Sequence, residues 1–96
     1  RITALRGASG PGIEFLEYLA PVDGRPYPAD ERSNDLVHWQ TRLVSKSAAE
    51  AAAELATARS PFVSSGVVEI PATDGGIRKS FVVRDPDGHA VEIAEQ

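Results

Sequence analysis

Hydrophobic and polar residues alternate in two short stretches at the start of the chain. Arg1 to Leu5 and Ile13 to Leu19 follow a period of two, which is typical of β-strands. The residues between them are rich in glycine, proline and serine, which tight turns favour. The pattern predicts a hairpin, and in its second strand Glu14 shares a face with Leu16 and Tyr18.

A break in this pattern follows, and then a third alternating stretch. Three prolines and a glycine in residues 20–34 disfavour helix and central strand, so this segment is predicted to be a linker. Leu36 to Val44 alternates again, which predicts a strand with one apolar face and one polar face. The expected polar face carries Leu36, His38, Gln40 and Arg42, and the other carries Val37, Trp39, Thr41 and Leu43.

The periodicity changes to that of a helix at Ser47. Ser47 and Glu50 have capping-box spacing, and the alanine-rich run that follows favours a helix that ends before Pro61. Small residues recur on one side of this helix and can lie close to a sheet. They are Ala48, Ala51, Ala52, Leu55 and Ala58.

The rest of the chain indicates extended structure. We expect an extended run over Phe62 to Ile70, a turn over Pro71 to Gly76, and strands over Arg78 to Arg84 and His89 to Ala94. Asp85 to Gly88 is first of all a turn between these two strands, and His89 beside it is expected to be structural. From Leu36 onward the predicted order is β, α, β, β, β, within an α+β fold.

Composition limits the classes of function. A chain of 96 residues with 42% hydrophobic and 25% charged residues is expected to form a single globular domain over residues 1–96. The net charge of -4 and scattered basic residues argue against nucleic acid as a partner. The chain has no cysteine, which fits a reducing cytoplasm, and no apolar run long enough to cross a bilayer. It also has no methionine and starts directly on a strand-like stretch, so we expect an N-terminal segment to be missing.

The order of elements and the final segment carry a family resemblance. The strand, helix and three strands that end in Val83-Arg84-Asp85-Pro86-Asp87-Gly88-His89-Ala90-Val91-Glu92 resemble one βαβββ module of the vicinal-oxygen-chelate superfamily, which includes glyoxalases, bleomycin-resistance proteins and extradiol dioxygenases. Such proteins pair two modules around a site in a curved sheet. The resemblance implies that residues 35–96 are a complete second module, that residues 1–19 are the last two strands of the first, and that residues 20–34 link them.

The resemblance also implies a divalent-metal site. The family's metal ligands lie on the first and last strands of each module, which places Glu14, His38 and Glu92 at three ligand positions. The fourth position falls in the missing part. One imidazole with carboxylates suits Fe, Mn, Zn, Ni or Co, and coordination would offset the cost of half-burying the carboxylates. Glu14 and Glu92 are then the candidates for moving a proton.

Five further residues are candidates for contact with a substrate. Gln40 and Arg42 continue the face of His38, and a four-residue turn would pair Phe81 with Glu92 on that same side, as a wall of the pocket. Lys79 and Arg42 are candidates for holding an anionic oxygen, although surface statistics favour a solvated cation at a strand end for each. Tyr18 lies on the face of Glu14, as a donor to substrate or as rim packing.

The resemblance leaves two classes of function open, beside a third possibility, a purely structural or partner-binding domain. One is a metal-dependent enzyme, a lyase, isomerase, epimerase or ring-cleaving dioxygenase, that acts on a small molecule with adjacent oxygens. The other is a metal-free protein that sequesters a small molecule, as bleomycin-resistance proteins do. An incomplete first module would leave sheet edges uncovered, so we also expect either a homodimer or a missing chain segment to cover them.

Overall fold

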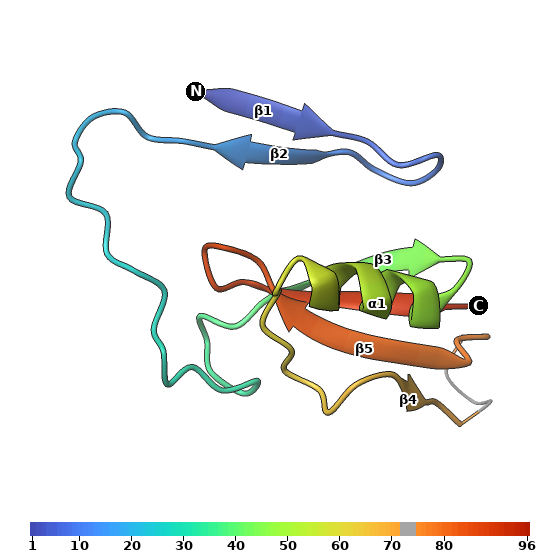
Figure 1. Ribbon diagram of the computed structural model, residues 1–96. Helices are drawn as coiled ribbons and strands as arrows, with labels where there is room; N and C mark the ends of the chain where they lie inside the picture. The colour runs from blue at the N-terminus through green and yellow to red at the C-terminus, as the bar shows by residue number, and fades with distance from the viewer. Residues whose placement is uncertain (72–74) are drawn as a thin grey trace.

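The computed structural model describes residues 1–71 and 75–96, and its first element is the predicted hairpin. Strands β1 (Ile2–Leu5) and β2 (Ile13–Leu16) are antiparallel, with Ala4 opposite Glu14. Strand β2 ends three residues earlier than predicted. The hairpin lies apart from the rest of the chain and is joined to it by a long segment without helix or strand (Figure 1).

The remaining strands form a four-stranded sheet in the order β3-β6-β5-β4. Strand β3 is parallel to β6, and the other pairs are antiparallel. The fold is therefore α+β, and the predicted order of β, α, β, β, β is confirmed. The strands and the helix are β3 (Gln40–Ser45), α1 (Ala48–Thr57), β4 (Val68–Glu69), β5 (Lys79–Arg84) and β6 (Ala90–Glu95).

Two of the predicted strands are shorter than expected. Strand β3 begins at Gln40 and not at Leu36, because residues 35–37 form a turn in which the His38 amide donates to the Asp35 carbonyl at 3.0 Å. Most of the run from Phe62 to Ile70 is not strand, since Phe62 makes only an isolated bridge to Val83 before β4. The turn predicted over residues 71–76 falls partly on residues 72–74, which lie outside the described residues.

Helix α1 covers one face of the sheet (Figure 1). Ser47 caps its first turn by accepting a hydrogen bond from the Glu50 amide at 3.2 Å, and the Glu95 carboxylate accepts from the Ala48 amide at 2.8 Å. The predicted alanine face packs on the sheet except at Ala58, which is the exposed C-cap residue. The core comprises Ala48, Phe81, Val83 and Ile93, with Ala51, Ala52, Leu55, Phe62 and Val91 packed against them. No helix in the described part of the chain is both long enough and apolar enough to cross a membrane.

The turn between β5 and β6 sets which side chains face α1. The Asp85 carboxylate accepts from the amides of Asp87 and His89, so His89 belongs to the loop and pairing starts at Arg84 and Ala90. The loop thus has one residue more than the four predicted. A slip of one residue exchanges the two faces of a strand.

Candidate functional site

The face of the sheet opposite α1 carries a group of polar residues. Phe81, Val83 and Ile93 pack against the helix, so the residues between them on β5 and β6 point to the other side. Strand β3 contributes two more side chains there. We define the polar face by four residues: Gln40, Arg42, Arg84 and Glu92.

Glu92 lies at the centre of this face and is only 7% exposed. Its carboxylate accepts a hydrogen bond from Arg42 Nε at 2.7 Å and another from Gln40 Nε2 at 3.1 Å. The parallel register explains this, because Arg42 is the partner of Glu92 across the two strands. A carboxylate loses its hydration on burial, and a charge-assisted bond to a guanidinium compensates for that loss. The prediction that Gln40 and Arg42 share a face with Glu92 is confirmed.

A second buried carboxylate, Glu31, comes from the linker. Its side chain is 1% exposed, one oxygen is bonded to His38 Nδ1, and the other accepts from an Arg84 terminal nitrogen at 3.1 Å. Arg84 is also held from the opposite side, because its other terminal nitrogen donates to the Gly88 carbonyl at 2.6 Å. Glu31 thus fastens the linker to both His38 and strand β5.

The pKa of Glu31 reflects two opposing effects. Burial of the carboxyl raises its pKa, while the hydrogen bonds from His38 and Arg84 lower it. The hydrogen bonds and the electrostatic interactions with His38 and Arg84 outweigh the effect of burial, so that the pKa lies below its ordinary value of 4.5. Sequence reasoning missed Glu31 because Asp30, Glu31 and Arg32 form a short charged run in a proline-rich segment, which looks like solvated linker.

Aromatic residues surround the turn that follows β5. The His89 ring lies edge-on to Tyr27 at 5.1 Å and tilted against Trp39 at 4.6 Å, and its Nδ1 is 3.1 Å from an Asp85 oxygen. These contacts fit the structural role expected for His89. Trp39, predicted on the apolar face of a strand, precedes β3 and is 52% exposed. Burial, followed by the negative charge of Glu31, raises the pKa of Tyr27.

An open groove separates the linker from this turn. Its volume is about 1050 Å³, and its walls are polar and apolar in nearly equal parts. The Tyr27 hydroxyl donates to the Val37 carbonyl at 3.1 Å and holds one wall in place. The lining residues are Leu16, Gly24, Arg25, Pro26, Tyr27, Pro28, Val37, Pro86, Asp87 and His89.

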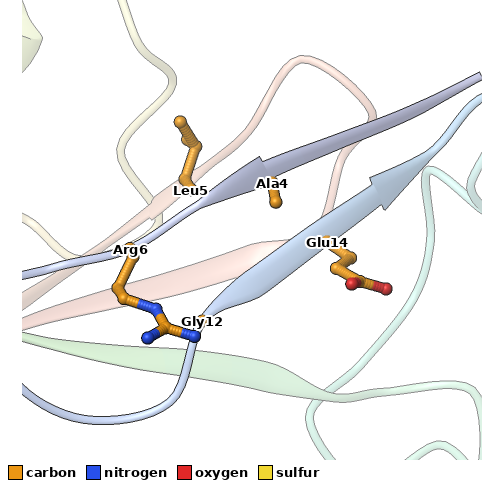
Figure 2. A pocket seen from close by; sticks show the side chains of 5 residues that line it. All are labelled: Ala4, Leu5, Arg6, Gly12 and Glu14. Atoms are coloured by element: carbon orange, nitrogen blue, oxygen red, sulfur yellow. The ribbon is translucent and has the colours of Figure 1, made fainter.

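The three predicted metal ligands do not come together. Glu14 lies on β2 and is exposed, and Figure 2 shows it lining a shallow hollow of the hairpin together with Arg6. His38 precedes Arg42, the partner of Glu92, by four residues, or about 13 Å of extended chain. In residues 1–71 and 75–96, no three His, Cys, Asp or Glu side chains are grouped so that they could hold a metal ion.

This arrangement does not fit the predicted metal. A cation at Glu92 would lie beside the Arg42 guanidinium, and a divalent ion needs its oxygen ligands at about 2.0–2.6 Å. The ligand set Glu14, His38 and Glu92, with Glu14 and Glu92 as proton-moving groups, therefore stays a prediction that this arrangement does not support.

Three predicted substrate contacts lie elsewhere. Phe81 pairs with Ile93 and not with Glu92, so it is 1% exposed in the core beneath α1 and cannot wall a pocket on the polar face. Lys79 is two residues before Phe81 on the same strand and points to the helix side as well. Tyr18 lies two residues beyond the end of β2 and is 78% exposed.

Comparison with known proteins does not identify the chain. No family model matches it, and no curated protein or solved structure matches it significantly.

Proposed function

We propose that this chain is a glyoxalase-like βαβββ module that binds a small, oxygen-rich molecule on its polar face without a metal. One observation carries the proposal: the buried Glu92 carboxylate is held by Arg42 and Gln40 on the face that α1 leaves uncovered. The order of elements from β3 to β6 supports the choice of fold.

The chemistry of this face favours a ligand with negatively charged oxygens. The Arg42 side chain is 47% exposed, and a guanidinium carries five N–H donors in a planar fork that suits carboxylate and phosphate oxygens. Glu92 fixes the direction of the fork by its bond to Nε. A pre-oriented guanidinium loses less freedom on binding a ligand than a free one does.

Oxalate is a suitable probe because it is a small dianion with adjacent oxygens. Added to ¹⁵N-labelled protein, it should shift the amide signals of β3 and β6, and Arg42→Ala should weaken its binding roughly tenfold to a hundredfold, the value of a charge-assisted hydrogen bond. The matched control is Arg78→Ala, which removes an exposed arginine paired with Glu95 and Gln96 at the far end of the sheet. Failure of oxalate to shift β3 and β6, or equal weakening in both variants, contradicts the proposal.

A divalent-metal enzyme of the lyase, isomerase or dioxygenase kind is the second candidate. The orientation of His38 favours it, since histidines that bind metals commonly donate their other ring N–H to a carboxylate, and Glu31 occupies that place. For such an enzyme, the predicted metal ligands would have to move from their positions in the structure before they could bind one metal ion.

Glu92→Gln separates the two candidates. The glutamine oxygen can still accept from Arg42 Nε and keep the guanidinium oriented, while the negative charge that repels an anion is removed, so oxalate binding should be unchanged or tighter if the face binds anions. If Glu92 is a metal ligand, the same variant should lose affinity for Mn²⁺, which can be measured by electron paramagnetic resonance. Stoichiometric Mn²⁺ binding that depends on both Glu92 and His38 would establish the second candidate and overturn the first.

A further inference from the structure

The pairing of His38 with Glu31 is independent of the contacts that hold Glu92. The carboxylate of Glu31 is almost completely buried, and each of its oxygens has its own partner, His38 Nδ1 or Arg84. Arg84 is positively charged at any pH at which the protein is folded. The carboxylate that faces His38 is therefore one half of an ion pair.

This environment determines which ring nitrogen of His38 carries the proton. An ionised carboxylate can only accept hydrogen bonds, so the nitrogen that faces it, Nδ1, must be the donor. In the neutral ring the lone pair is then on Nε2. Nδ1 is anchored in the protein, and Nε2 is the nitrogen left to react.

Nε2 of His38 is not fully buried. The described residues provide no hydrogen-bond partner for it, and none of their buried side-chain nitrogens or oxygens lacks a partner, so this atom cannot be buried. The side chain as a whole is 19% exposed. His38 lies just before β3, and Glu31 joins it to Arg84, so the ring is held at the end of the polar face where Arg84 lies.

We infer that His38 is a base for a hydroxyl group of the bound molecule and that Glu31 is the residue that positions it. In the step the hydroxyl O–H bond breaks, its electron pair stays on the ligand oxygen, and the proton moves to Nε2. The ligand oxygen is left as an alkoxide hydrogen-bonded to the protonated ring, and the proton goes back to the ligand when that alkoxide is neutralised, so no oxidant or second substrate is needed. The ligand class is a hydroxylated small molecule, such as a hydroxy acid or hydroxy ketone. A buried carboxylate behind an imidazole is the arrangement by which proteins orient such bases.

This inference rests on the proposed function only for the presence of a bound ligand, and its test needs none. In protein labelled with ¹⁵N-histidine, at one fixed pH at which the ring is neutral, two-bond ¹H–¹⁵N spectra should show His38 with the proton on Nδ1. Glu31→Gln replaces the carboxylate by an amide that can donate as well as accept, so the ratio of Nδ1–H to Nε2–H tautomers should fall roughly tenfold. Asp85→Asn is the matched control, because it alters the carboxylate beside His89 and should leave His38 unchanged.

Reactivity provides a second readout that a merely structural contact would not change. Diethyl pyrocarbonate acylates unprotonated imidazole nitrogens, and peptide mass mapping distinguishes His38 from His89. His38 should be acylated in the wild-type protein and roughly tenfold more slowly in Glu31→Gln. A wild-type His38 protonated on Nε2, or one inert to the reagent, overturns the inference even if the variant does not fold. Either result can occur while oxalate still binds at Arg42, so the two proposals fail separately.

Discussion

At the scale of single residues, Glu31 makes the stability of the fold depend on acid. The folded state lowers the pKa of Glu31 below its ordinary value of 4.5, because His38 and Arg84 stabilise the charged form. The stabilisation is therefore complete above about pH 4.5 and is lost as the pH falls through the lowered pKa. Glu31→Gln should be less stable than the wild type at neutral pH and should lose less stability on acidification, as measured by urea unfolding at a series of pH values.

The control for this experiment is Glu50→Gln. Glu50 is an exposed carboxylate in the first turn of α1, outside the cluster of His38 and Arg84, and its removal should leave the acid dependence almost unchanged. An acid dependence that is equally steep in Glu31→Gln and in the wild type would mean that other carboxylates are responsible.

Single residues also show where sequence reasoning stops being accurate. That Gln40 and Arg42 share one face of β3 followed from strand alternation, a local property, whereas the register of β3 and β6 brings them to Glu92. The position of Phe81 depended on the number of residues in the turn, and Asp85 adds His89 to that turn through a side-chain bond. The extra residue in the turn shifts the register by one position, so Phe81 lies in the core and not in the expected wall of a pocket.

At the scale of elements, α1 could be predicted because its signals are local. Ser47 occupies the cap position that its spacing to Glu50 indicates, and the alanine face packs on the sheet. The start of β3 could not be predicted in the same way. His38 and its neighbours alternate like a strand, but the turn over residues 35–37 and the bond to Glu31 hold His38 outside it.

The end of α1 provides a test of local backbone strain. Arg59 follows the C-cap residue Ala58 with a φ of 58°, a left-handed conformation that glycine adopts far more easily than arginine does. The side chain is exposed, so little packing is lost on its removal. Arg59→Gly should stabilise the protein by about 0.5–1 kcal/mol in urea unfolding. Arg59→Ala keeps the strain and should give no such gain, and equal effects of the two variants would contradict the explanation.

At the scale of the whole molecule, the sequence predicted the α+β class and the order of elements but not the position of the hairpin relative to the four-stranded sheet. The expected metal set needed Glu14 from the hairpin beside His38 and Glu92 from the other sheet. Alternation fixes a face within one sheet and contains no information about the distance between two sheets. A second copy of the chain or a further segment remains the predicted partner for the uncovered edges of β3 and the hairpin.

Hydrogen exchange can test whether the hairpin depends on such a partner. Strands β1 and β2 contact each other but make no extensive contact with the second sheet, and Ile2, Leu5, Phe15 and Leu16 are between 46% and 65% exposed. An isolated two-stranded hairpin is marginally stable in water, so the amides of β1 and β2 should exchange quickly in dilute protein while those of β5 and β6 stay protected. If two copies cover each other's hairpins, protection of β1 and β2 should rise with protein concentration, in step with the dimer fraction seen by sedimentation. If the amides of β1 and β2 instead exchange slowly at every protein concentration, the hairpin is stable without a second copy.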